Sequence, residues 1–132
     1  MGHTIKLAAM GAVAFMLLDG VWLGLVMKHF YRDHLAPIVR LADGGIAPNW
    51  PAALVVYALL GVGIALFVLP RASTVPQAAV YGAAFGLVVY GVYDFTNYST
   101  LRQWPFVLTL ADAAWGAVAS SACAAAVRML VP

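Results

Sequence analysis

The chain has 132 residues and little charge: 64% of the residues are hydrophobic and 9% are Asp, Glu, Lys or Arg. Because soluble domains carry about 25% charged residues, this composition excludes an ordinary soluble protein and predicts an integral membrane protein. The net charge of +2 includes no basic block, which argues against a nucleic-acid partner. The lone cysteine, Cys123, excludes a disulfide framework and a cysteine-based zinc site.

Four apolar segments are each long enough to cross a hydrocarbon core of roughly 30 Å, which takes about 20 helical residues. We predict membrane spans over about residues 5–27, 50–69, 76–98 and 105–130. The first segment is interrupted by Asp19 and has no small-residue cleavage site, so we interpret it as a span and not as a signal peptide. The predicted fold class is all-α: a polytopic four-transmembrane-helix bundle that forms a single domain over residues 1–132.

The connections between these spans differ in length. In the long connection after the first span, we expect KHFYRDHL (residues 28–35) to prolong the first helix above the membrane until Pro37, and ADGGIAPN (residues 42–49) to form a loop. The connection at Arg102-Gln103 is so short that the last two helices must be antiparallel neighbours. Basic residues are spread almost evenly over the two membrane faces, so they do not determine the orientation of the protein. We expect the termini to lie in the cytoplasm.

Three of the predicted spans contain an aspartate that is followed, three residues later, by Trp or Asn. The motifs are LLDGVWLG (17–24), YDFTN (93–97) and LADAAWGA (110–117). A charge within a span costs a few kcal/mol and is usually retained for function. From the helix directions and a rise of about 1.5 Å per residue, we predict that Asp19, Asp94 and Asp112 lie roughly 6–12 Å below the same membrane face. We therefore expect one shared site.

The aspartates also lie on rows of small residues. Two rows have a spacing of four and the first helix adds a pair: Gly82, Gly86, Tyr90 and Asp94; Leu108, Asp112, Gly116 and Ser120; Gly20 and Gly24. Small residues at this spacing let helix backbones approach closely in lipid, so we expect the aspartates to face the interior. The alanine-rich segment AVASSACAAAV (117–127) predicts close packing against another helix, in this chain or in a second copy.

No Lys, Arg or His lies in the middle of a span, so the aspartates need another way to balance their charge. Three alternatives are open: the acids share protons, they hold a cation or a cationic ligand, or neighbouring side chains supply hydrogen bonds. The candidate ligand- or proton-binding residues are Asp19, Trp22, Tyr90, Tyr93, Asp94, Asn97, Asp112 and Trp115. The candidates for gating or counter-charge are Lys28, Asn49 and Arg102.

These motifs together resemble a family of small bacterial membrane proteins known as domain of unknown function 2177. The similarity rests on LDGVWLG, PNWPAAL, YGVYDFTNYSTLRQW and LADAAWGA, in this order, and covers essentially the whole chain. The resemblance implies a four-span, multi-pass protein of the bacterial inner (cytoplasmic) membrane with these polar positions as its hallmark. It implies no reaction and no cofactor. Family members are often encoded beside genes for lipid modification, which associates the family with lipid chemistry.

Several of these residues also have simpler interpretations. We expect Trp50 and Trp104 in the aromatic belt at the membrane interface, and we expect Asn49 to cap the second span. The three intramembrane acids could be packing residues that hydrogen-bond Trp, Tyr and Asn across helices. Under that interpretation the polar positions would stabilise the bundle and bind nothing.

Our leading hypothesis is a polar pocket, open to one membrane face, that is formed by the first, third and fourth spans and roofed by residues 28–49. It would bind an amphipathic or lipid-like molecule, with the acids at its polar head. Two acids could act as general acid and base, but the sequence has no nucleophile elbow, phosphate loop, His box or flavin motif, so enzymatic activity is undecided. The alternatives are a dimeric proton- or cation-coupled transporter and an accessory subunit of a larger membrane complex. No metal site is predicted from His29, Asp33 and His34, which do not share one helix face.

Overall fold

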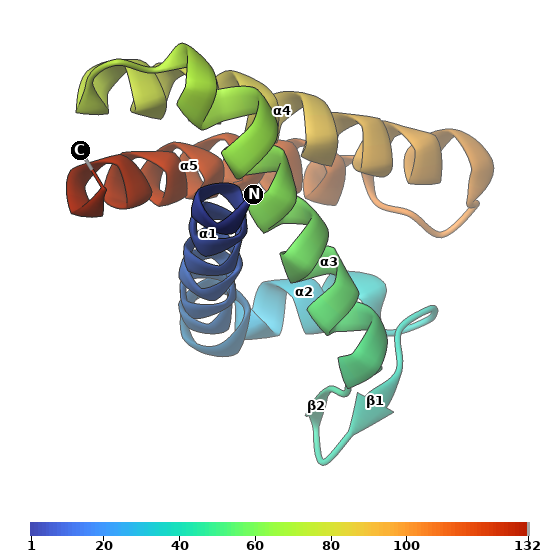
Figure 1. Cartoon of the computed structure of the whole chain (residues 1–132). Helices are drawn as coiled ribbons and strands as arrows, with labels where there is room; N and C mark the ends of the chain where they lie inside the picture. The colour runs from blue at the N-terminus through green and yellow to red at the C-terminus, as the bar shows by residue number, and fades with distance from the viewer. Residues whose placement is uncertain (132) are drawn as a thin grey trace.

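The computed structural model describes residues 1–131, and it consists of helices joined by short connections and one small hairpin (Figure 1). In chain order the elements are α1 (Gly2–Val21), a π-helical segment (Trp22–Val26), α2 (Lys28–Leu35), β1 (Leu41–Ala42), β2 (Gly45–Ile46), α3 (Trp50–Gly63), a second π-helical segment (Ile64–Val68), a 3-10 turn (Leu69–Arg71), α4 (Val75–Thr100) and α5 (Phe106–Leu130). In the described chain, four segments are long and apolar enough to cross a membrane: Gly2–Val26, Trp50–Arg71, Val75–Thr100 and Phe106–Leu130. The predicted all-α membrane fold is confirmed, and the bounds differ from the prediction by only a few residues.

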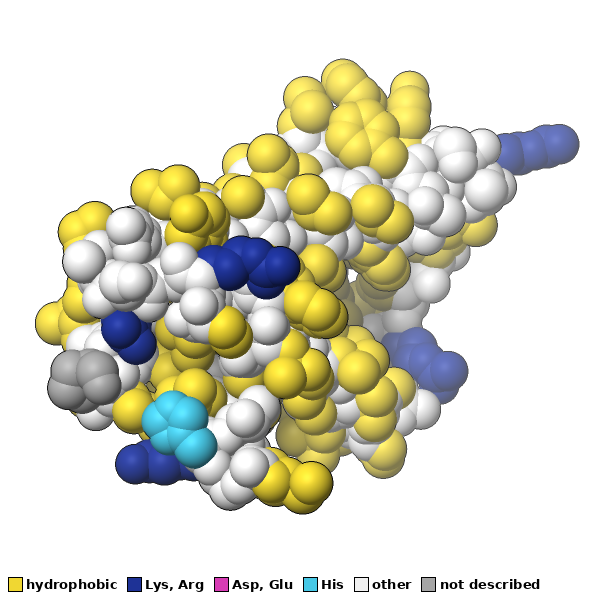
Figure 2. Space-filling model, turned by 45° about the horizontal axis from the view of Figure 1, so that its top comes forward, with side chains coloured by type: hydrophobic (Ala, Val, Ile, Leu, Met, Phe, Trp, Pro, Cys, Tyr) yellow, Lys and Arg dark blue, Asp and Glu magenta, His cyan; other side chains and the backbone are white. Residues whose placement is uncertain are grey.

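The outer surface of the helices is apolar. Leu25, Leu59 and Val88 are examples of large hydrophobic side chains that are more than half exposed. Figure 2 shows a surface covered mainly by hydrophobic side chains, with scattered Lys and Arg and no acidic side chain visible on the face drawn. Contiguous apolar surface on this scale is unfavourable in water and is matched by the hydrocarbon of a lipid bilayer. The fold is therefore that of an integral membrane protein.

Two helix starts are fixed by side-chain caps. The Asn49 Oδ1 atom accepts a hydrogen bond from the backbone N–H of Ala52 (3.3 Å), and the Thr74 hydroxyl oxygen accepts one from the N–H of Gln77 (3.4 Å). Each cap satisfies one of the backbone donors that a helix leaves unpaired in its first turn. The predicted capping role of Asn49 is confirmed.

The helices α4 and α5 lie side by side along most of their length (Figure 1). A Cβ atom added to Gly86 would collide with the carbonyl oxygen of Gly116 and the hydroxyl of Ser120, and one added to Gly116 would collide with the ring of Tyr90. A Cβ atom on Gly82 would meet the backbone of Ser120 at 2.5 Å. The two predicted rows of small residues therefore form the α4–α5 interface and allow the close approach of the backbones.

The alanine-rich part of α5 packs within the chain. Ala119, Cys123 and Ala124 are fully buried, and the Cys123 thiol donates a hydrogen bond of 3.4 Å to the carbonyl oxygen of Gly11 in α1. The close packing predicted for this segment is thus provided by α1 and α4 of the same chain.

The helices α1 and α3 touch near one end and separate toward the hairpin (Figure 1). At the contact, a Cβ atom on Gly11 would lie 3.1 Å from the Cα atom of Gly61. A Cβ atom on Gly20 or Gly24 would meet nothing within 4 Å. The prediction that Gly20 and Gly24 form a packing pair is therefore wrong: α1 has already moved away from α3 at this depth, and these glycines border an open space.

The helix α2 does not prolong α1, contrary to the prediction. The chain bends at Met27 (φ −113°, ψ 16°), and α2 then runs at an angle to α1 (Figure 1). The cause is its own amphipathic pattern: Tyr31 and Leu35 lie one turn apart and bury their side chains against Trp104 and Leu108, next to the α4–α5 connection. The helix therefore covers one end of the bundle.

The segment predicted as a plain loop contains an antiparallel hairpin. Leu41 pairs with Ile46 and Ala42 pairs with Gly45. Both turn residues have positive φ values, 50° for Asp43 and 75° for Gly44. Asp-Gly is the dipeptide that favours a two-residue turn of this kind, so the sequence carried a hairpin signal that the loop prediction missed.

Candidate functional site

Asp19 connects three helices. It lies three residues before the first π-helical segment, is only 8% exposed, and accepts a hydrogen bond of 2.7 Å from the indole Nε1–H of Trp115 in α5. The hydroxyl of Tyr57 in α3 lies beside the same carboxylate. The carboxylate is therefore held by a donor from α5, with a hydroxyl from α3 beside it, as burial of a charge requires.

Asp112 is held by the surface helix α2. Its Oδ1 atom accepts a hydrogen bond of 2.5 Å from the Tyr31 hydroxyl, which in turn accepts one of 3.1 Å from the indole Nε1–H of Trp22. Burial raises the pKa of Tyr31, and the nearby charge of Asp112 adds to this effect. The hydroxyl therefore stays protonated and remains a donor to the carboxylate.

The repeated Asp-x-x-Trp motif has a reciprocal structure. The rings of Trp22 and Trp115 stack in parallel, with centroids 4.2 Å apart and planes 2° apart. Trp115 donates to Asp19 of α1, and Trp22 reaches Asp112 of α5 through Tyr31. Each tryptophan thus serves the aspartate of the other motif. The π-helical segment that begins at Trp22 lies beside this stack, a position in which such segments are often functional.

Asp94 occupies the most secluded position of the three aspartates. It has no exposed surface and lies beside Asp112 and Trp104, but neither of its oxygens has a hydrogen-bond partner among residues 1–131. The indole N–H of Trp104 is also buried without a partner in that part of the chain. Trp104 is 9% exposed and packs edge-on against Tyr93, with centroids 5.8 Å apart. The prediction that Trp104 belongs to the interfacial belt is therefore wrong, because α2 covers it.

Two neighbouring spaces adjoin these residues. The first, which we call the lateral cleft, has a volume of about 650 Å³, lies between α1 and α3 beneath the hairpin, and is lined by Met16, Asp19, Gly20, Leu23, Gly24, Lys28, Ala42, Asp43, Gly45, Ile46, Pro48, Trp50, Ala53, Val56 and Tyr57. The second, which we call the inner cavity, has a volume of about 430 Å³ and is lined by Asp19, Leu23, Tyr31, Leu35, Val39, Ile46, Val56, Leu60, Val89, Tyr90, Tyr93, Trp104, Asp112 and Trp115. Both spaces share Asp19, Leu23, Ile46 and Val56, so Asp19 lies at their junction.

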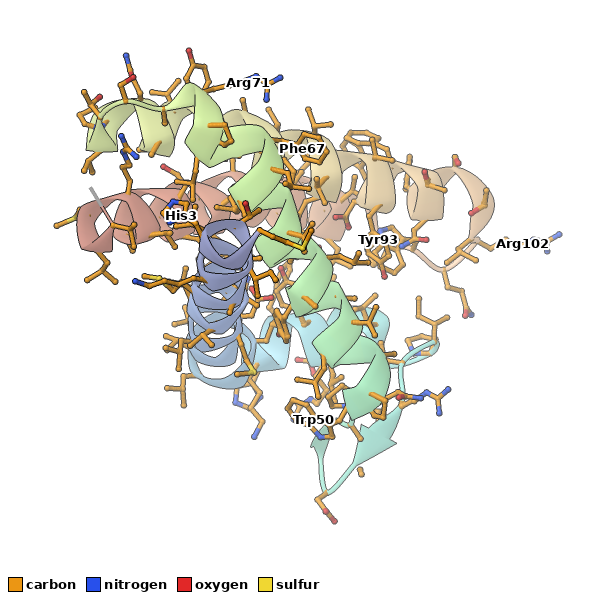
Figure 3. All side chains as sticks on the ribbon, in the orientation of Figure 1. His3, Trp50, Phe67, Arg71, Tyr93 and Arg102 are labelled. Carbon is orange, nitrogen blue, oxygen red and sulfur yellow. The ribbon has the colours of Figure 1, made fainter. Side chains whose placement is uncertain are left out.

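The three loop candidates take different positions. Lys28 lines the lateral cleft, whereas Asn49 caps α3. Arg102 is exposed and points away from the helices, and Trp50 lies at the hairpin end of α3 (Figure 3). Lys28 therefore borders the same cleft as Asp19, whereas Arg102 lies outside both spaces.

Most of the candidate residues predicted from the sequence lie around the inner cavity, and α3 contributes lining residues that were not predicted. Tyr90 and Tyr93 line the inner cavity together with Asp19, Asp112 and Trp115, and half-buried Asn97 lies beside Tyr93. The pocket hypothesis omitted the second span, which is α3 in the structure and supplies Tyr57, Val56 and Leu60.

Three residues of the site are not among those predicted from the sequence. They are Tyr31, Tyr57 and Trp104. Tyr57 carries a hydroxyl in the middle of a span that is otherwise apolar, which is a usable signal. Tyr31 lies one helical turn before Leu35 in a polar segment, so its burial follows from the periodicity of α2. Trp104 gave no comparable signal, because a tryptophan beside a span start usually marks the interface.

The fold and this site define a small multi-spanning membrane protein with a pocket of carboxylates, tyrosines and tryptophans between its helices. The chain belongs to the family described as "Predicted membrane protein (DUF2177)", whose model matches residues 4–129. No curated protein and no solved structure matches the chain. The resemblance drawn from the four motifs is confirmed, and the family description gives a membrane location without an activity.

Proposed function

We propose that the protein binds an amphipathic or lipid-like molecule, whose polar head lies against the aspartates and tyrosines and whose apolar chain lies in the lateral cleft. The observation that carries this proposal is the junction of the two spaces at Asp19. A mainly apolar cleft and a cavity with several polar groups there share lining residues, which matches the two ends of an amphiphile. We place this site in the bacterial inner membrane, on the side covered by α2 and the hairpin.

Access from the lipid supports the proposal. The lining residues Leu23, Trp50 and Val56 are all exposed on the outer surface, Val56 to 53%. We propose that the lateral cleft opens between α1 and α3 toward the hydrocarbon of the bilayer. A lipid-like molecule can insert its head through this opening and keep part of its chain among the surrounding lipids.

The volumes of the lateral cleft and the inner cavity are also those of a ligand-binding pocket. Ligand pockets in proteins commonly enclose about 300–1,000 Å³ and combine mainly apolar walls with a few polar groups. The volumes of about 650 and about 430 Å³ both fall in this range, and the two spaces share four lining residues. The inner cavity accommodates a head group, and the cleft accommodates part of an alkyl chain.

A role in helix packing alone accounts less well for the polar residues. A purely structural polar network is expected to satisfy its buried groups, because each unpaired group costs free energy. Here both oxygens of Asp94 and the indole N–H of Trp104 have no partner among residues 1–131. Asp94 lies beside Trp104, and Trp104 lines the inner cavity, so its unpaired N–H favours a bound molecule there.

The test uses alkyl chains of one length that carry bromine, which quenches tryptophan fluorescence on contact. Three probes differ only in the head: an amine, an alcohol and a carboxylic acid. They are titrated into the purified protein in alkylmaltoside micelles. We expect saturable quenching by at least one probe. Val56→Phe narrows both spaces and is expected to weaken that binding about tenfold, or ~1.4 kcal/mol.

Val55→Phe is the matched control, because Val55 is 58% exposed on the same helix and lines neither space. It should bind the probe as the unchanged protein does. Equal affinities of the Val56→Phe and Val55→Phe variants, or quenching that only rises in proportion to the probe in the micelle, would contradict the proposal.

A further inference from the structure

We infer that the head group is a protonated amine: the inner cavity takes the ammonium end of a cationic amphiphile beside Asp112, with Asp94 behind it. This inference rests on the proposed function and adds the charge and chemical class of the ligand.

The charges around the inner cavity are of one sign. Asp19 and Asp112 line it, and Asp94 lies beside Asp112. Within the described chain, no Lys, Arg or His lines this cavity; Lys28 borders only the lateral cleft. An anionic head would meet like charges without a compensating cation, whereas an ammonium group would be attracted by every carboxylate present.

Within the described chain, the carboxylate of Asp94 is buried without a hydrogen-bond donor. It has no exposed surface, and both oxygens lack a partner among residues 1–131. Its neighbours Asp112 and Trp104 both line the inner cavity. A buried charge without a partner is strongly unfavourable, and a charge-assisted hydrogen bond from an ammonium group is the strongest kind available to a carboxylate. Asp94 itself lies behind this wall, so an amine head in the cavity donates directly to Asp112 and offsets the charge of the adjoining Asp94–Asp112 pair, which an alcohol does only weakly.

Aromatic side chains complete the recognition. Five of them line the inner cavity: Tyr31, Tyr90, Tyr93, Trp104 and Trp115. The faces of aromatic rings attract cations, and the attraction strengthens where water is excluded. Carboxylates and aromatic side chains around one space form a combination that suits an ammonium ion and offers no corresponding advantage to an alcohol or a carboxylate.

The experiment compares the three brominated probes on the unchanged protein at neutral pH. We expect the amine to bind at least about tenfold more tightly than the alcohol, as expected for a cation in a desolvated aromatic site with carboxylates. The carboxylic acid should bind most weakly. Asp112→Asn should reduce the preference for the amine to less than about threefold, because it removes the charge and keeps the size and the acceptor of the side chain.

Asp33→Asn is the matched control, since Asp33 is an exposed aspartate on α2 that pairs with its neighbour Arg32. It should keep the full preference. Should Asp112→Asn fail to fold, the comparison of the three probes on the unchanged protein still decides. The alcohol or the acid binding as tightly as the amine would overturn the ammonium inference and leave the proposed function intact. Absence of saturable binding by all three probes would overturn both.

Discussion

The Tyr31→Phe substitution probes the connection between the surface helix and the intramembrane acids. The Tyr31 hydroxyl is the donor to Asp112 at 2.5 Å and the acceptor from Trp22 at 3.1 Å, and the side chain is 5% exposed. Phenylalanine keeps the ring and its packing against α5 but removes both hydrogen bonds. The Asp112 oxygen and the Trp22 N–H then lose their partner in a buried environment.

The expected cost follows from these two bonds. A hydrogen bond to a charged group contributes about 1.5–3 kcal/mol and a neutral one about 1 kcal/mol, whereas polar bonds within membranes average about 0.6 kcal/mol. Since α2 lies outside the predicted spans, at the boundary between these regimes, we expect Tyr31→Phe to lower the free energy of unfolding by about 2 kcal/mol. In a double-mutant cycle, Tyr31→Phe and Asp112→Asn should show a coupling energy of about 1 kcal/mol.

The assay is unfolding by a denaturing detergent in mixed micelles, followed by tryptophan fluorescence and circular dichroism. Tyr81→Phe is the control, because Tyr81 is 42% exposed on α4. It should change the free energy of unfolding by less than about 0.5 kcal/mol, as is usual for surface positions. A Tyr31→Phe variant as stable as the Tyr81→Phe variant, with no coupling to Asp112, would refute the proposed docking of α2 through this hydroxyl.

Three further substitutions test separate parts of the account. Gly86→Ala should destabilise the protein by about 2 kcal/mol or more in the same unfolding assay, because the added Cβ atom collides with the Gly116 carbonyl. The control is Gly91→Ala, which should be neutral or stabilising because a Cβ atom at Gly91 meets nothing within 4 Å. Asp94→Asn should fold normally but lose most of the preference for the amine probe; full retention of that preference would assign Asp94 a packing role. Gly44→Ala should weaken the hairpin by about 1 kcal/mol, because the φ value of Gly44 is 75°. Faster amide hydrogen exchange in β1 and β2 would report this loss, whereas unchanged exchange would show that the turn tolerates alanine.

The sequence predicted the membrane fold well because its signals are local. Span length and hydropathy determined the four crossing helices, and the glycine spacing identified the α4–α5 interface at Gly86 and Gly116. The separation of α2 from α1 was missed because both segments have helical propensity. What separates them is tertiary: Tyr31 and Leu35 are buried only if the chain bends at Met27.

The candidate site was predicted in part. Helix rise placed the aspartates at one depth, and the structure has Asp19 and Asp112 on one cavity with Asp94 beside Asp112. The depth of a residue along its helix axis does not reveal which other helix packs against it. The contribution of Tyr57 and the burial of Trp104 were therefore not predicted. The hydrogen-bond partner of each motif tryptophan could not be predicted either, since Trp115 donates to Asp19 and not to the aspartate of its own motif.

The most direct test of the central claim is the position of a bound amphiphile in a crystal structure of the protein with the brominated alkylamine. Anomalous scattering identifies bromine without ambiguity about the atom type. We expect a bromine peak in the lateral cleft between α1 and α3, with the amine nitrogen within hydrogen-bond distance of Asp112 or Asp19. Bromine peaks found only on the outer, lipid-facing surface of the helices would contradict it.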